Sequence, residues 1–236
     1  MTVKNFVVIG GSYGIGAGIV ARLAQQQHRV DLLSRTNEAD DCADSANIHF
    51  HRFDALSDDI NPDWLPDEIH GLVYCPGSIN LGPLRGLKPA AMMQDYQLNV
   101  IGAVKCLQAC LKPLKAAKDA SVLMFSTVAV SQGLAMHASV AAAKGAVEGL
   151  TRALAAELAP KIRVNCIAPS LVDTPLAESL LSTEQKREAL SQRHPLKRLG
   201  TVDDIASLAA FLLSSDATWI TGQVVGVDGG LSRVRS

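Results

Sequence analysis

Aromatic residues, excess charge and long apolar runs are all scarce in this chain of 236 residues. Aromatic residues make up 4% of it, and 22 Lys and Arg against 23 Asp and Glu leave a formal net charge of −1. The basic residues are scattered, which argues against a nucleic-acid-binding face or a membrane-surface patch. No apolar stretch approaches the ~20 residues that cross a bilayer. We therefore expect neither nucleic acid nor membrane among its partners.

Paired cysteines are also lacking. The five cysteines are an odd number, and none forms a CxxC pair with a His at zinc spacing; they are Cys42, Cys75, Cys106, Cys110 and Cys166. His49 and His51 alternate along one strand but have no third ligand, so we expect no metal site. Free thiols fit a reducing cytoplasm, and a glycine run starting at residue 10 leaves no room for a signal peptide. These features predict a cytoplasmic protein.

Apolar residues make up 48% of the chain and fall into short runs that alternate with longer helical patterns. The short runs predict strands over 6–9, 30–33, 48–53, 71–75, 122–125, 164–167 and 224–227. Helical spacing predicts helices over 15–27, 90–111, 138–158 and 202–213. Continuous apolar strands alternating with helices indicate a parallel sheet covered on both faces. No linker divides the chain, so residues 1–236 are expected to form a single-domain, doubly wound α/β Rossmann fold.

A glycine-rich loop joins the first predicted strand to the first predicted helix. It reads Gly10-Gly11-Ser12-Tyr13-Gly14-Ile15-Gly16. Glycine allows a tight turn and a close approach of backbone to phosphate, and a helix N-terminus offers free N–H groups and the positive end of its dipole. This context predicts that the loop binds the diphosphate of a dinucleotide.

The residues at the end of the second predicted strand indicate which of the two nicotinamide cofactors binds. NAD binders place an Asp or Glu there for the ribose 2′-hydroxyl, whereas NADP binders need positive charge. This strand ends in Ser34 and Arg35, with no acid. Because both side chains can reach a 2′-phosphate, we expect NADP(H) rather than NAD(H).

These features resemble the short-chain dehydrogenase/reductase family over nearly the whole chain. Residues 10–16 are similar to its TGxxxGIG loop, with Ile9 where Thr is usual. Asp54, followed by Ala55, resembles the Asp beside the adenine ring, and Gly77 alone is kept from the NNAG motif. The stretch from 54 to 71 is shorter than in the family, which implies a turn around Pro62, Trp64 and Pro66 instead of a helix.

Two further motifs lie in the second half of the chain. Asn165, Pro169 and Thr174 resemble the NxxxPGxxxT stretch beside the nicotinamide, with Ser170 in place of Gly. Residues 219–223 and 227–230 are similar to the C-terminal signature of the family. The resemblance implies that the cofactor also contacts Gly77, Pro169, Val172 and Thr174.

The catalytic pattern of the family, Ser-x12-Tyr-x3-Lys with an Asn behind it, is incomplete here. Lys144 and Asn99 fit the Lys and Asn positions, and Thr127 stands at the Ser position, next to Ser126. Val140 occupies the Tyr position and cannot donate a proton. In the family, Tyr protonates the alkoxide while Lys lowers the pKa of Tyr and holds the ribose. The resemblance implies that Lys144 contacts the cofactor in any case.

Three interpretations stay open. His137 lies seven residues before Lys144, the offset of the catalytic Tyr in enoyl reductases of the superfamily, and its imidazole could supply the proton. Alternatively, a water held by Asn99 and Lys144 supplies it at a lower rate. Either way the chain is an NADP(H)-dependent reductase of a carbonyl or activated C=C bond. In the third interpretation it is a catalytically inactive dinucleotide-binding protein, acting as a sensor or partner subunit.

Substrate and assembly are predicted more coarsely. The stretch 175–199 is expected to cover the substrate, with Leu176, Leu180 and Leu181 on its inner face and Leu134 and Met136 opposite. This favours a small, partly apolar substrate. Members of the family pair through the two long helices, which implies a homodimer or homotetramer joined near residues 90–111 and 138–158.

Overall fold

The computed structural model describes residues 3–37 and 46–235, so Cys42 lies outside the described residues. Its centre is a parallel sheet of seven strands in the order β3-β2-β1-β4-β5-β6-β7. The strands are β1 (Asn5–Ile9), β2 (Arg29–Ser34), β3 (Ile48–Arg52), β4 (Gly71–Tyr74), β5 (Ala120–Phe125), β6 (Ile162–Pro169) and β7 (Val224–Val227). The α/β Rossmann architecture predicted from the alternating pattern is therefore confirmed.

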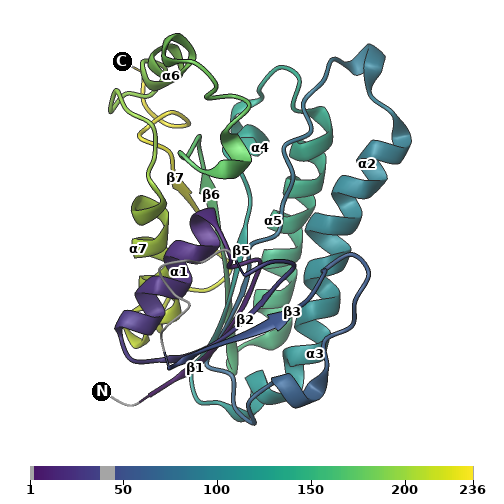
Figure 1. Ribbon diagram of the computed structural model, residues 1–236, viewed down its shortest axis with the longest axis vertical. Helices are drawn as coiled ribbons and strands as arrows, with labels where there is room; N and C mark the ends of the chain where they lie inside the picture. Colours follow the sequence, from purple (N-terminus) through teal and green to yellow (C-terminus); the bar gives the residue numbers. More distant parts are fainter. Residues whose placement is uncertain (1–2, 38–45, 236) are drawn as a thin grey trace.

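Helices cover both faces of the sheet (Figure 1). The longer ones are α1 (Gly14–Gln25), α2 (Pro89–Tyr96), α3 (Gly102–Ala116), α5 (Ala138–Leu158) and α7 (Val202–Leu213), and the shorter ones are α4 (Ala129–Gln132) and α6 (Glu184–Ser191). Side chains alternate along a strand, so Val8 packs on one side with α1 and α7, while Val7 and Ile9 pack on the other with α3 and α5. Both faces are thus apolar, as the uninterrupted apolar strands predict.

The helix predicted over 90–111 is interrupted by a wider turn. A π-helical segment at Gln97–Ile101 joins α2 to α3, and α3 continues past Pro113 to Ala116. Extra-wide turns of this kind are often found at functional sites. This one contains the buried Asn99.

Between β3 and β4 the chain forms a single 3₁₀ turn at Pro62–Trp64, as the short spacing there implies. The Asn61 side chain accepts the Asp63 N–H and caps this turn. None of the helices in the described part of the chain is both long and apolar enough to cross a membrane.

Candidate active site

One cleft of about 850 Å³ runs along the carboxyl edge of the sheet. It crosses the gap between the ends of β1 and β4, where the strand order changes direction and where open α/β sheets bind ligands. The cleft is lined by His137, Thr127 and every residue predicted to bind the cofactor: Gly10, Ser12, Tyr13, Gly14, Ile15, Gly16, Ser34, Arg35, Asp54, Ala55, Gly77, Lys144, Pro169, Val172 and Thr174. Asn99 is fully buried and lies behind Gly77 instead.

The glycine-rich loop is built so tightly that side chains are excluded from it. A Cβ on Gly16 would overlap the carbonyl oxygen of Gly10, and one on Gly11 would lie 2.7 Å from the Leu32 side chain. Gly10 and Gly14 adopt positive φ values of 75° and 58°. No side chain caps the start of α1, so its first N–H groups face the cleft unpaired by a capping side chain. An anion suits this position.

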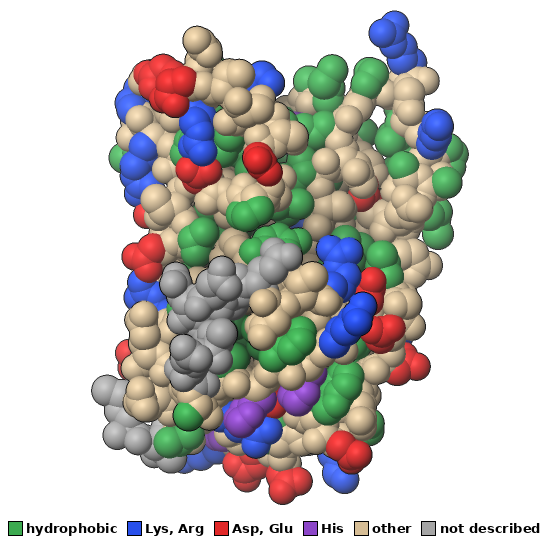
Figure 2. Space-filling model, in the orientation of Figure 1, with side chains coloured by type: hydrophobic (Ala, Val, Ile, Leu, Met, Phe, Trp, Pro, Cys, Tyr) green, Lys and Arg blue, Asp and Glu red, His purple; other side chains and the backbone are tan. Residues whose placement is uncertain are grey.

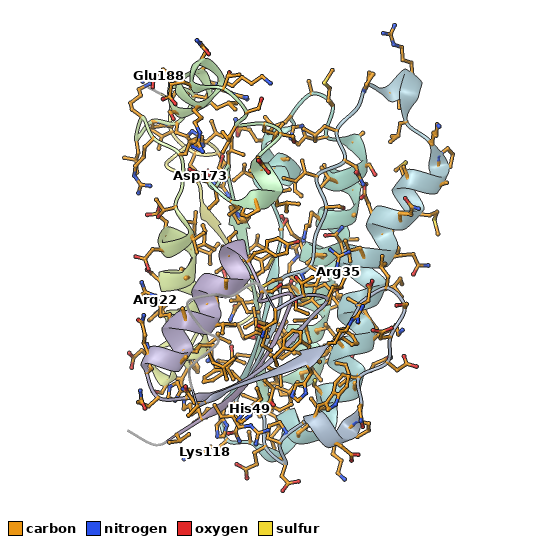
Figure 3. The ribbon with its side chains drawn as sticks, viewed as in Figure 1. Arg22, Arg35, His49, Lys118, Asp173 and Glu188 are labelled. Carbon is orange, nitrogen blue, oxygen red and sulfur yellow. The ribbon has the colours of Figure 1, made fainter. Side chains whose placement is uncertain are left out.

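Two arginines stand where β2 and β3 end. Arg35 follows β2 and is exposed (Figure 3), and Arg52 ends β3 opposite Ser34 in the strand register. Figure 2 shows lysine and arginine side chains gathered near the end of β3 on this face. Asp54 follows β3, and its Oδ1 accepts the Leu56 N–H at 2.9 Å, which fixes the carboxylate in the cleft wall. Arg52 was not predicted, although its place at the end of a strand beside Ser34 could have indicated it.

Lys144, Asn99 and Gly77 meet at the far end of the cleft from these arginines. A Cβ on Gly77 would lie 3.3 Å from Lys144 Nζ and 3.5 Å from Asn99 Oδ1, so both groups crowd against this glycine. Asn99 Nδ2 donates to the Asp95 carbonyl oxygen at 2.8 Å. Asn99 Oδ1 is buried and has no hydrogen-bond partner in the described part of the chain. A buried acceptor left free is costly, which marks this spot as a place for a donor from a ligand or water.

The pKa of Lys144 is lowered to about 8, chiefly because burial removes its ammonium from water. The carboxylate of Asp95 acts in the opposite direction and favours the charged ammonium. Burial also raises the pKa of the Cys75 thiol, which lines the cleft, to about 12. Lys144 therefore changes charge near pH 8 and is mostly the ammonium at neutral pH, whereas Cys75 stays a thiol.

A buried carboxylate that the sequence did not reveal supports this group. Asp95 is 1% exposed. Its Oδ1 accepts hydrogen bonds from Ser78 Oγ and Asn80 Nδ2, both at 2.6 Å, and its Oδ2 accepts one from Ser139. The carboxylate thus ties the loop after β4 to the start of α5. Its signal in the sequence was weak, because a single Asp in a helical pattern is usually solvated.

The cleft lining also includes the positions at which this chain departs from the family pattern, Thr127 and Val140, together with His137. Thr127 Oγ1 accepts the Ala129 N–H at 3.3 Å, which leaves its own O–H free to donate. Val140 is 6% exposed, lines the cleft and offers no proton. His137 stands at the start of α5, and its Nδ1 lies 2.7 Å from the Ala135 carbonyl oxygen.

The tyrosine phenols do not replace the missing one. Tyr74 donates its O–H to the Leu98 carbonyl oxygen at 2.6 Å, and burial raises its pKa far above the usual range. Tyr13 belongs to the phosphate loop, and Tyr96 is exposed on α2. The Ser126 hydroxyl is not a free donor to the substrate either, because its Oγ donates to Glu148 at 2.8 Å.

The segment that follows β6 covers this end of the cleft. Leu176 and Leu180 line it, as do Leu134 and Met136 from the opposite side, whereas Leu181 is buried in the segment itself. The segment also brings His194 into the cleft wall, where its Nε2 lies 2.8 Å from Ser170 Oγ. No sequence pattern pointed to His194, because one His within a polar loop has no distinguishing spacing.

Two structural observations indicate that these residues fit a nicotinamide dinucleotide. The loop at residues 10–16 has no room for side chains where a diphosphate would approach the backbone, and an unpartnered buried oxygen lies with Lys144 beside Gly77 where a ribose would offer hydroxyls. The residues that would hold such a group are spread along one continuous cleft.

Comparison with known proteins agrees with this geometry. A family model described as enoyl-(acyl carrier protein) reductase matches residues 10–232. A short-chain dehydrogenase/reductase of Arabidopsis thaliana is 31% identical over 93% of this chain and 76% of its own length. A 3-oxoacyl-[acyl-carrier-protein] reductase of Chlamydia muridarum is 32% identical over 97% of each chain.

Solved structures give the same answer for the fold. The aldohexose dehydrogenase of Thermoplasma acidophilum superposes with a TM-score of 0.87 at 27% identity, covering 99% of this chain and 97% of its own. ElxO, solved with NADP bound, superposes with a TM-score of 0.86 at 26% identity, covering 98% of this chain and 99% of its own. Sequence and structure agree that this chain belongs to the short-chain dehydrogenase/reductase family of oxidoreductases.

Proposed function

We propose that this protein is an NADP(H)-dependent reductase that acts on the carbonyl or activated C=C bond of a small, partly apolar substrate. The observation that carries the proposal is the cleft itself, which joins the side-chain-free loop at residues 10–16 to Lys144 and Asn99. The whole chain serves as one dinucleotide-binding domain in this proposal. The proposal also places the protein in the cytoplasm.

Positive charge at the adenosine end favours NADP(H) over NAD(H). Ser34 and Arg35 are poised for a 2′-phosphate, and Arg52 stands beside them on the neighbouring strand. No carboxylate follows β2 at residues 35–37 to repel that phosphate. The bound cofactor of ElxO is in line with this choice.

At the other end of the cleft, when NADPH is bound, its nicotinamide supplies a hydride. The Lys144 ammonium is placed to donate to the ribose hydroxyls, and the Thr127 O–H is free to donate to a carbonyl oxygen of the substrate. Pro169, Val172 and Thr174 form the wall beside the nicotinamide position, and a Cβ on Gly14 of the phosphate loop would lie 3.4 Å from the Thr174 side chain. Apolar side chains of the covering segment exclude water and favour an apolar substrate body.

The proton must come from a group other than a tyrosine at position 140. His137 lines the cleft and is one source, and a water held between Asn99 and Lys144 would be another. Val140 also favours a second candidate function, a protein that binds NADP(H) without turnover. A positioned acid typically raises the rate by ~10²–10⁴-fold. Only a rate measurement can therefore distinguish a slow enzyme that lacks this acid from an inactive protein.

Assembly into a homodimer or homotetramer belongs to the same proposal. Small residues of α5 are exposed, among them Ala142 and Ala153, and they would allow a second copy to approach closely.

The direct experiment is NADPH consumption by the purified protein with a panel of ketones, enones, 3-oxoacyl thioesters and enoyl thioesters. The thioesters enter the panel because the relatives named above include reductases of this kind. Turnover with at least one class supports the reductase. Saturable NADPH binding without turnover across the panel would favour the non-catalytic alternative.

A further inference from the structure

Ser170 and His194 form a hydrogen-bonded pair in the wall of the cleft. Ser170 Oγ lies 2.8 Å from His194 Nε2, and His194 is 3% exposed. Both residues line the cleft, Ser170 from the end of β6 and His194 from the covering segment. The pair therefore combines a hydroxyl that reaches the substrate space with a titratable group behind it.

The tautomer of His194 follows from its second contact. Nδ1 lies 3.0 Å from the Leu190 carbonyl oxygen, which can only accept, so Nδ1 carries a proton. In the neutral ring Nε2 is then an acceptor and receives the Ser170 O–H. In the protonated ring Nε2 donates to Ser170, whose own O–H is released toward the cleft. The pair can thus pass one proton between the imidazole and the cleft.

Ser170 is also next to the hydroxyl that would bind the substrate carbonyl. The Val128 N–H donates to the Pro169 carbonyl oxygen at 3.1 Å, which joins the segment after β5 to the last residue of β6. Thr127 and Ser170 each lie one residue from this bond. A carbonyl oxygen bound by Thr127 would therefore face a second hydroxyl on the adjoining strand.

Charged groups of both signs lie beside His194. The turn at 227–230 packs against it, since a Cβ on Gly229 would lie 3.4 Å from the His194 Cβ. This turn carries Asp228, whose burial acts to raise its pKa, but hydrogen bonds from Ser232 and the Gly230 N–H outweigh this and lower it. Asp228 thus stays ionised near the imidazole, while Arg193 is the charged neighbour on the same segment and extends to the cleft.

We propose that Ser170 and His194 relay the proton that completes the reduction. The relay rests on the proposed reductase function. Hydride transfer to the carbonyl carbon moves the C=O π pair onto the oxygen. The Ser170 O–H bond then breaks as its proton forms the O–H bond of the alcohol, and the Nε2–H bond of the imidazolium breaks as that proton passes to Ser170. The neutral imidazole regains a proton from water through Ser170 after the product leaves.

The first test uses the protein without cofactor. Long-range ¹⁵N NMR of the imidazole should find the His194 proton on Nδ1 in the neutral ring, and Ser170→Ala should shift the Nε2 resonance. A neutral His194 with its proton on Nε2 would overturn the relay.

The second test uses the substrate class that the panel identifies. His194→Gln keeps a group that can bond Ser170 but cannot titrate, and we expect kcat to fall about 10²-fold or more with little change in the Kd for NADPH. His49→Gln makes the same substitution on β3, outside the cleft lining, and should leave kcat unchanged (Figure 3).

A phenol introduced at position 140 distinguishes a lost proton donor from a structural defect as the cause of a low kcat in His194→Gln. Val140→Tyr places an acid one helical turn before Lys144, so it should recover at least about tenfold of the rate lost in His194→Gln. A double variant no faster than His194→Gln, when Val140→Tyr alone is active, would assign the loss to structure and overturn the relay. Unchanged kcat in His194→Gln, or a large loss in His137→Gln instead, would overturn the relay alone. A wild-type chain that binds NADPH but reduces nothing would overturn the proposed function as well.

Discussion

Ser12 Oγ lies 2.7 Å from Ser34 Oγ, and this buried hydrogen bond joins the phosphate loop to the end of β2. The loop that would hold the diphosphate and the strand end that would hold the 2′-phosphate are therefore fixed relative to each other before a ligand arrives. Preorganisation of this kind lowers the cost of ordering the site on binding. Cofactor choice should consequently depend on the few charges at this strand end rather than on loop closure.

Replacing Arg35 with alanine should reduce NADPH affinity without changing NADH affinity. A hydrogen bond to a charged group is worth about 1.5–3 kcal/mol, so we expect a loss of about 10–100-fold. Arg52→Ala should have a smaller effect in the same direction. Titration calorimetry with both nucleotides measures the two effects, and Lys118→Ala, an exposed residue outside the cleft lining, is the control. Equal losses for NADPH and NADH would contradict the role of Arg35.

Gly16→Ala should abolish binding of both nucleotides. The added Cβ would overlap the Gly10 carbonyl oxygen, so the loop must open where a diphosphate would be held. Gly149→Ala is the matched control, because no atom lies within 4 Å of its Cβ position in α5. Removing a glycine from a helix interior should raise the free energy of unfolding by about 0.8–1.0 kcal/mol. Retained nucleotide binding in Gly16→Ala would show that the diphosphate lies elsewhere.

The lowered pKa of Lys144 predicts a pH dependence of both stability and binding. Below pH about 8 the native protein carries a buried ammonium at a cost, and above it this charge is lost. The unfolded lysine keeps its proton up to the ordinary value of 10.5, so the wild type should gain stability relative to Lys144→Met as pH rises from about 8 to 10.5. NADPH affinity should fall over the same rise in the wild type and stay flat in Lys144→Met. Denaturant unfolding measures the stability and calorimetry measures the NADPH affinity across this pH range. Stability curves of wild type and Lys144→Met that run parallel with pH would contradict the lowered pKa of Lys144.

Asp95→Asn should weaken the link between the loop after β4 and α5. The amide keeps one acceptor oxygen where the carboxylate accepts from Ser78, Asn80 and Ser139, so part of this network is lost. We expect the free energy of unfolding to fall by about 1–3 kcal/mol. The pH midpoint of NADPH binding should also move lower, because the carboxylate favours the charged Lys144. Asp216→Asn, an exposed change, should alter neither value.

Most of the fold could be predicted because most strands are short, largely apolar runs that alternate with helical patterns. The ranges predicted for the helices at 138–158 and 202–213 and for the strand at 224–227 coincide with α5, α7 and β7. A capping box of Thr201 and Asp204 starts α7, and Pro160 follows the end of α5 closely. The break at Gln97–Ile101 was not predicted, because residues on both sides of it keep a helical spacing and no Gly or Pro marks the π turn itself.

The cleft lining was predictable where a glycine, a charge or a strand end fixed the position. Asp95 and His194 were not, because each acts through partners that are distant in sequence. Asp95 bonds Ser139, 44 residues away, and His194 bonds Ser170, 24 residues away. Only the folded chain brings these pairs together.

NADP(H) binding requires that the diphosphate fits the loop at residues 10–16 and that the 2′-phosphate fits Arg35. Titration calorimetry of the purified protein with NADPH and NADH tests that fit. We expect saturable heat with both nucleotides and a Kd for NADPH at least about tenfold lower, as one charge-assisted contact to the 2′-phosphate implies. No heat with either nucleotide would contradict the fit and the reductase function with it.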